Sequence, residues 1–139
     1  MKMKKIGLLL LAVVVMTLMT GCEIYGSDNG ALDGFWQLTE MTVWEDGEQT
    51  GPTDMRESGI YWGVQGDLLR IDGTYFDFEY SGHTLRVWNP YSGDTYVEDA
   101  SELKCYGLYN LEEIFTVEQL TGSEMTLQSE MVKLRLRKY

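Results

Sequence analysis

Apolar and polar residues alternate along much of the chain, which is the pattern of half-buried β-strands. In the clearest example, residues 74–80, the side chains of Phe76, Phe78 and Tyr80 share one face. The other face holds Tyr75, Asp77 and Glu79. Residues 132–138 repeat this pattern, with valine and leucine alternating with lysine and arginine. One face of each segment is therefore expected to contact a core, and the other to contact water.

The first predicted strand, Leu32–Trp44, is the longest, and turn residues lie on both sides of it. Four of its residues share one face at a period of two: Trp36, Leu38, Thr42 and Trp44. Further strands are predicted at 60–65, 68–72, 74–80, 84–88, 114–120, 125–128 and 132–138. Residues Glu45–Gly59 are rich in charge and contain two internal glycines and a proline, so this segment is predicted to be a surface loop.

A weak segment between Thr95 and Glu113 brings the candidate strands to nine. Many short strands with no convincing amphipathic helix favour an all-β fold. We predict a small antiparallel up-and-down β-barrel, because closure removes the exposed edges of an open sheet. Antiparallel closure requires an even number of strands, so we expect about eight.

The first 21 residues predict a lipoprotein signal peptide. Three lysines precede an apolar run from Ile6 to Met19, which is too short to remain as a membrane span. The following Gly21-Cys22 resembles a lipobox, where Cys22 is acylated with palmitate-type chains and becomes the first residue. An ordinary signal peptide near a structural cysteine is the alternative. The predicted division is a signal peptide at 1–21, a lipidated tether at 22–31 and a barrel domain at 32–139.

Removal of the signal peptide changes the formal charge from −11 to −14, because residues 1–21 contain three lysines and no acid. This charge repels nucleic acid and anionic lipid, so no nucleic-acid partner is expected. Only Cys22 and Cys105 are present, so acylation of the first leaves no internal disulfide. Cys105 is predicted to be buried. We expect a monomer held by its lipid at the outer membrane of the cell envelope.

Gly34-Phe35-Trp36 resembles the Gly-x-Trp signature of lipocalins and related calycins. Together with the lipobox and the spacing of later segments, it makes the chain similar to the lipocalin-like domains of Bacteroidota envelope lipoproteins. Those segments are Asp72–Phe76, Ser81–Leu85, Phe115–Thr121 and Leu134–Leu136. The resemblance implies that Trp36 plugs one end of the barrel, with Arg137 or Arg135 as its cationic partner.

The residues do not suggest an enzyme. His83 is the only histidine and stands in a predicted turn, which leaves a Ser-His-Asp or Cys-His arrangement without an oriented base. One histidine and one free cysteine also fall short of a usual zinc ligand set. We therefore expect no catalytic residues, no metal site and no cofactor.

Seventeen aromatic residues follow Cys22, and those near predicted strand ends favour a binding site. Six residues are expected to contact the ligand. Trp62, Phe76 and Phe78 would form the walls of the barrel interior, and Trp44, Trp88 and Tyr91 would surround its open end. The principal hypothesis is that a small hydrophobic ligand enters the barrel. The alternative is a non-enzymatic module that binds a protein or glycan and has its interior filled by side chains.

Overall fold

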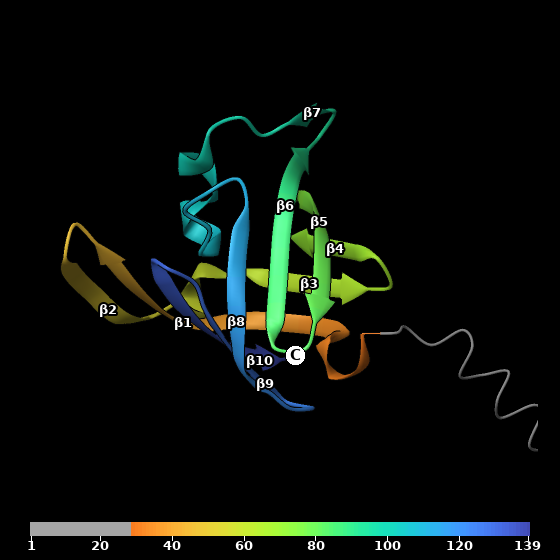
Figure 1. The fold of residues 1–139 in the computed structure, drawn as a ribbon, viewed down its shortest axis with the longest axis horizontal. Helices are drawn as coiled ribbons and strands as arrows, with labels where there is room; N and C mark the ends of the chain where they lie inside the picture. Colours follow the sequence, from red (N-terminus) through yellow and green to blue (C-terminus); the bar gives the residue numbers. More distant parts are fainter. Residues whose placement is uncertain (1–28) are drawn as a thin grey trace, which may run out of the picture.

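Hydrogen bonds between the first and last strands close an antiparallel sheet into a barrel (Figure 1). The computed structural model describes residues 29–139. Eight strands form the wall in the order β1 (Gly34–Glu45), β3 (Tyr61–Gln65), β4 (Leu68–Ile71), β5 (Thr74–Ser81), β6 (Thr84–Ser92), β8 (Glu113–Leu120), β9 (Glu124–Gln128) and β10 (Val132–Lys138). The predicted all-β class and the closed eight-stranded barrel are confirmed.

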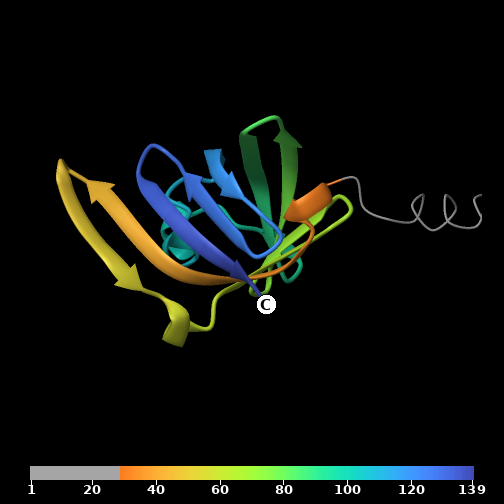
Figure 2. The same ribbon diagram turned by 90° about the horizontal axis from the view of Figure 1, so that it is seen from below.

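Two further strands extend the sheet outside the wall. β2 (Glu48–Asp54) pairs with the second half of β1, and the two project together from the barrel (Figure 2). The prediction of a loop over Glu45–Gly59 was wrong, because this segment holds β2 and the short helix η2 (Arg56–Ser58). All seven residues of β2 are exposed, so the segment carries no alternation that would identify it as a strand.

The first strand begins at Gly34 rather than Leu32, which belongs to the short helix η1 (Gly30–Leu32). A register shift between Leu38 and Glu40 then interrupts its pairing with β10. After the shift, Val43 lies opposite the buried Val132 and packs against the core. The predicted face of β1 is therefore right before the shift and reversed after it, because an inserted residue reverses the alternation. Thr42 is nevertheless buried, at 6% exposure, opposite Lys133.

The chain also departs from the prediction after residue 88. β6 continues to Ser92, four residues beyond the predicted strand at 84–88, with Asn89 at a φ of 60°. β7 (Thr95–Tyr96) pairs only with β6 and does not enter the wall. The helix η3 (Ala100–Tyr106) follows, and the Asp99 carboxylate caps it by accepting from the Ser101 N–H.

The core is built from inward side chains of all eight wall strands. Twenty hydrophobic residues are buried, and the largest, Trp36, Trp62 and Phe115, have no exposed surface. The predicted inward faces of β5 and β10 are confirmed, since Phe76 is 4% exposed and Leu134 is fully buried. Within residues 29–139, no helix has the length and apolarity needed to cross a membrane. The predicted signal peptide and Cys22 lie outside the described residues.

Candidate functional site

One end of the barrel is covered by η1 and the start of β1. Leu32 is fully buried, and the Trp36 indole N–H donates to its carbonyl oxygen at 2.8 Å. The Lys138 ammonium lies 4.9 Å from the centre of the Trp36 ring. Lys138 is directly opposite Trp36 in the β1–β10 register, whereas Arg137, the cation expected there, is opposite Gln37. Lys138 therefore takes the place expected for Arg137, because adjacent strand residues face opposite ways.

The opposite end is covered by η3 and the turn after it. Leu103 and Leu108 are each 1% exposed and belong to the core. Between them, Gly107 packs against β10 so closely that an added Cβ would lie 2.5 Å from the Leu134 side chain. Its φ of 90° also suits glycine. The backbone of this segment therefore lies directly on the barrel core.

Polar contacts attach η3 to neighbouring strand ends. The Lys104 ammonium lies 3.5 Å from a Glu45 carboxylate oxygen at the end of β1. The Tyr106 hydroxyl donates to the Asp72 carboxylate in the β4–β5 turn at 3.3 Å. Burial raises the pKa of the Tyr106 phenol, and the nearby Asp72 charge raises it further. Both contacts are near the surface, so they orient η3 more than they stabilise it.

A buried carboxylate holds the segment after η3. Glu113, which begins β8, is only 4% exposed. One of its carboxylate oxygens accepts from the Tyr109 backbone N–H at 3.1 Å and from the Asn110 side-chain amide at 3.0 Å. These bonds satisfy a charged group that would otherwise be costly to bury. Glu113 therefore fixes the return of the chain from the covered end into the wall.

The interior between the two covered ends is filled by side chains. Trp62, Phe76 and Phe78, which the sequence predicted as ligand contacts, belong to the core or pack against it. The Trp62 ring meets Phe115 edge to face, with centroids 6.1 Å apart. Trp62 Nε1 is buried and has no hydrogen-bond partner among the described residues. The three expected wall residues therefore occupy the interior that a ligand would need.

The other three predicted contacts are not part of this interior. Trp88 is half-buried on the outer wall, with the Arg86 guanidinium 3.9 Å from its ring centre. Tyr91 packs edge to face on Tyr96 of β7 at 5.1 Å. Trp44 alternates with the inward Val43, so the register shift in β1 places it on the outer face. The structure does not bring these aromatics together at a mouth.

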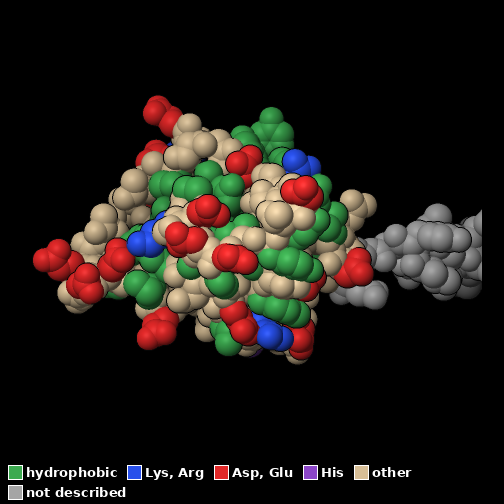
Figure 3. All heavy atoms as spheres, turned by 90° about the horizontal axis from the view of Figure 1, so that it is seen from above, with side chains coloured by type: hydrophobic (Ala, Val, Ile, Leu, Met, Phe, Trp, Pro, Cys, Tyr) green, Lys and Arg blue, Asp and Glu red, His purple; other side chains and the backbone are tan. Residues whose placement is uncertain are grey.

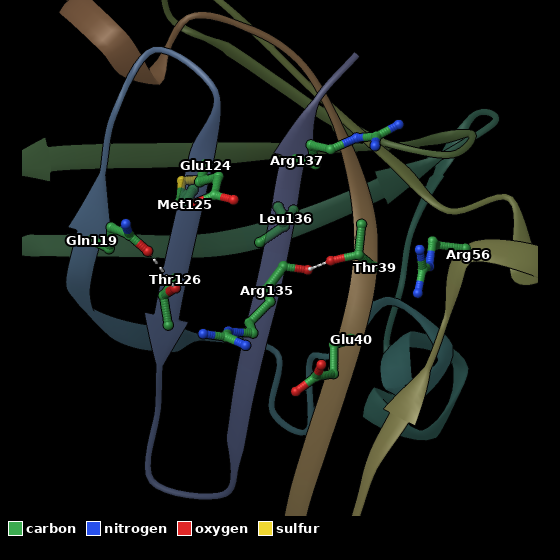
Figure 4. Close-up of a pocket in the computed structure, with 10 residues that line it drawn as sticks. All are labelled: Thr39, Glu40, Arg56, Gln119, Glu124, Met125, Thr126, Arg135, Leu136 and Arg137. Atoms are coloured by element: carbon green, nitrogen blue, oxygen red, sulfur yellow. Dashed lines mark hydrogen bonds between the residues drawn. The ribbon is translucent and has the colours of Figure 1, made fainter.

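A polar pocket of about 270 Å³ lies on the outer wall where β8, β9, β10 and β1 adjoin (Figure 4). Its lining residues are Thr39, Glu40, Arg56, Gln119, Glu124, Met125, Thr126, Arg135, Leu136 and Arg137. In Figure 4 the side chains of Arg135 and Arg137 leave β10 on opposite sides, Arg135 toward β9 and Arg137 across β1. The sequence showed outward arginines on this strand, but it did not show which neighbouring strands would join them.

The pocket offers both cationic donors and carboxylate acceptors. Arg135 is opposite Glu40 in the sheet register, and Arg137 is opposite Glu124. Neither arginine forms an ion pair within the described part of the chain. Arg56 is instead engaged by a carboxylate outside the pocket. The two β10 guanidinium groups can therefore donate to an oxygen-rich ligand.

The pairing of Arg56 with Asp54 has a clear electrostatic signature. Two guanidinium nitrogens of Arg56 donate to the two carboxylate oxygens of Asp54, each at 3.1 Å. The backbone N–H of Arg56 also donates to Asp54, and these bonds together lower the pKa of the Asp54 carboxyl. Arg56 is consequently a less available donor than the two arginines of β10.

The remaining chemical candidates lie apart from the pocket. His83 stands in the β5–β6 turn, where its carbonyl oxygen accepts from Val117. Cys105 is exposed on η3, so the prediction of a buried cysteine was wrong, although partial burial raises the pKa of its thiol. Among residues 29–139, no three histidine, cysteine or acidic residues form a group suited to a metal ion.

Comparisons with known proteins agree with this architecture. The family model described as a lipocalin-like domain matches residues 17–139. The crystal structure of a lipocalin-like protein from Bacteroides uniformis superimposes with a TM-score of 0.56. The two sequences are 19% identical, and the match covers 79% of this chain and 100% of the Bacteroides uniformis chain. An uncharacterized protein from Bacteroides eggerthii is 24% identical, with a TM-score of 0.55 and coverages of 77% and 98%. These two matches show a shared fold. No curated protein matches the chain.

Proposed function

This chain belongs to the family of lipocalin-like domains, and we propose that it is a lipid-anchored binding module of the cell envelope whose ligand contacts the outer wall. One observation carries the choice of the outer wall. The barrel interior is filled and both ends are covered, whereas the polar pocket lies outside. Binding rather than catalysis is the role that this arrangement favours.

A panel of apolar probes tests the outer-wall proposal. Fatty acids, bile acids and porphyrins are titrated into the purified full chain while tryptophan fluorescence is followed. Trp36 and Trp62 have no exposed surface, so a filled interior predicts no saturable change in their emission. The titration therefore uses a Trp44→Phe, Trp88→Phe double variant, because those two half-buried residues lie on the outer wall and leave Trp36 and Trp62 as the emitters. Saturable quenching of this variant by any of the probes, with the fold intact by circular dichroism, would contradict the outer-wall proposal.

The proposed anchor is an acylated Cys22, at the outer membrane, and rests on the sequence around that residue. Two acyl chains would be enough to hold the domain stably at a bilayer. Labelled palmitate should enter the wild-type protein and place it in the membrane fraction. The Cys22→Ala variant should lose the label, and Cys105→Ala is the matched control that should keep it. Labelling of Cys22→Ala would show that the anchor has been assigned to the wrong residue.

A second function is favoured by the Trp62 indole, whose buried N–H has no hydrogen-bond partner within residues 29–139. Such a donor costs about 1–3 kcal/mol when it is left unpaired. A small hydrophobic ligand with one acceptor oxygen could satisfy it, provided that η3 moves aside and the core repacks. In this case Trp62→Phe should weaken binding of that ligand, and a probe that binds both proteins equally would argue against contact with the indole.

A further inference from the structure

Six residues lie directly beside one another across the outer face of neighbouring strands. The sheet register places them in the order Phe35, Gly63, Arg70, Tyr75, Tyr91 and Tyr96. Because paired residues on adjacent antiparallel strands point to the same face, these six form one continuous line, which we call the outer row. With neighbouring strands about 4.8 Å apart, the row extends roughly 24 Å along the wall.

Three of the four aromatic residues of the outer row are exposed, and Tyr91 is half-buried. Phe35 is 52% exposed, Tyr75 40% and Tyr96 60%. At the β1 end, Phe35 stacks on Tyr61 with an interplanar angle of 19° and a centroid distance of 5.5 Å. Tyr139, which is 80% exposed, packs edge to face on Tyr61 at the same distance. The row therefore begins with a cluster of three aromatic rings.

Stability of the sheet explains only part of this arrangement. Aromatic cross-strand pairs strengthen a sheet, and the Phe35 ring covers Gly63, where an added Cβ would lie 3.3 Å from it. However, a ring that served only to cover the wall would have most of its surface buried. Phe35 and Tyr96 each leave more than half of their surface in water. Exposed aromatic surface arranged in a line is a feature of binding surfaces.

Polar groups and hollows accompany the rings. A hollow of about 510 Å³ lies on one side of Phe35, lined also by Leu68 and Gln65, and a second of about 180 Å³ is lined by Phe35 and Tyr61. Arg70 lines both hollows. Its guanidinium donates to the Asp72 carbonyl oxygen at 2.6 Å and lies 5.6 Å from the Tyr75 ring centre. The fixed guanidinium thus places donors between successive rings.

We propose that the outer row binds a neutral oligosaccharide chain along the barrel wall. A pyranose ring has apolar C–H faces, which pack on aromatic rings, and hydroxyl groups at its edge, which suit the Arg70 guanidinium and the Gln65 amide. This inference goes beyond the proposed function, because no residue of the outer row lines the polar pocket.

The charge of the protein favours a neutral glycan over other occupants. The formal net charge is −11 for the whole sequence, and acidic side chains are spread over the face seen in Figure 3, where basic ones are few. This field repels acidic polysaccharides and anionic lipid surfaces. A neutral chain does not experience that repulsion.

Affinity electrophoresis of the full chain in detergent tests the proposal. Native gels contain hydroxyethylcellulose, glucomannan or amylopectin as neutral probes, and polygalacturonate as the acidic one. At least one neutral probe should retard the protein, and polygalacturonate should not. Tyr75→Ala and Tyr96→Ala should each weaken retardation by about tenfold. Ile114→Ala is the matched control, because Ile114 is 60% exposed on the outer wall but outside the row.

Three results would overturn the proposal. In the first, no neutral probe retards the protein. In the second, the Tyr75→Ala and Tyr96→Ala variants are retarded as much as the wild type. In the third, glycan binding is lost once the protein is reconstituted in phosphatidylcholine vesicles. The last would indicate that the row rests on a bilayer. Circular dichroism of each variant separates lost binding from lost folding. None of these outcomes affects palmitate labelling or the apolar-probe titration, so a failed glycan proposal is distinguishable from a failed outer-wall module.

Discussion

Trp36 connects several parts of the barrel at once. Its indole N–H donates to Leu32, its ring lies beneath the Lys138 ammonium, and it is opposite Trp62 in the sheet register. The ring is fully buried, so its removal leaves a large cavity. A cation near an aromatic face adds about 0.5–2 kcal/mol, depending on how far the pair is desolvated.

We predict that Trp36→Ala lowers the free energy of unfolding by about 3–5 kcal/mol, the range for a buried aromatic. Trp44→Ala is the control, because Trp44 is half-buried on the outer face and should cost about 1 kcal/mol. Urea unfolding followed by circular dichroism measures both values. Equal losses would mean that Trp44 supports the core as much as Trp36 does.

Residue-level prediction succeeded where alternation is uninterrupted and failed at the insertion in β1. Phe76 and Leu134 lie within strands of regular alternation, so their burial could be predicted from the spacing of apolar residues. Beyond Leu38, the extra residue moved Val43 inward and Trp44 outward. Nothing in the local composition marks that insertion, because it depends on pairing with β10. The expected mouth therefore could not be placed correctly from the sequence.

Among the elements, η3 covers the end of the barrel opposite η1. Its attachment depends on both packing and backbone conformation. At Gly107, a φ of 90° and the closeness of Leu134 each exclude a larger residue. The element is short, yet it decides whether the interior is accessible.

We predict that Gly107→Ala is more destabilising than Gly93→Ala by about 1–3 kcal/mol, the cost of overpacking a core. Both glycines have positive φ, so backbone strain is common to the two variants. Only Gly107 has atoms within 4 Å of an added Cβ. Thermal and urea unfolding of the pair measure the difference, and similar stabilities would show that η3 shifts easily away from β10.

The attachment of η3 should also weaken in alkali. Burial raises the pKa of the Tyr106 phenol above its usual 10.0. The unfolded chain therefore releases this proton at a lower pH than the folded chain does. The contribution to stability is intact below about pH 10 and is lost as the pH rises through the folded pKa.

Urea midpoints measured between pH 8 and pH 11 should consequently fall above pH 10. Tyr106→Phe removes the titrating hydroxyl and should show a smaller fall over the same range. If the two proteins lose stability in parallel, the alkaline loss comes from other groups, such as Tyr109, whose pKa burial also raises.

Elements with one buried face were the predictable ones. β5 and β10 have regular alternation and were placed within one residue of their observed ends. β2 has no buried residue, so its composition is that of a loop. η3 buries only Leu103 within its own length, which is too little to produce a helical pattern. β2 is defined by its hairpin pairing with β1, and η3 by its contacts with strands that are distant in the sequence.

At the scale of the whole molecule, the many short strands and the demand for closure were sufficient to predict the barrel, and closure reduced the nine candidate strands to eight. They did not predict whether it would be hollow, because that depends on how η1 and η3 meet the core. The aromatic residues illustrate the difficulty. Phenylalanine fills the interior at Phe115 and lies on the outside at Phe35, which is 52% exposed. Composition alone does not separate these roles.

The projecting pair of β1 and β2 has a consequence for the behaviour of the protein at high local concentration. The β1–β10 pairing closes the barrel, but within the described residues no strand pairs with the outer side of β2. β2 is therefore an exposed edge strand. Pro52 has no N–H to donate to a strand of another molecule, and the exposed carboxylates of Glu48 and Asp54 repel the β2 edge of another copy of the protein. These residues should stop neighbouring copies from joining edge to edge into filaments.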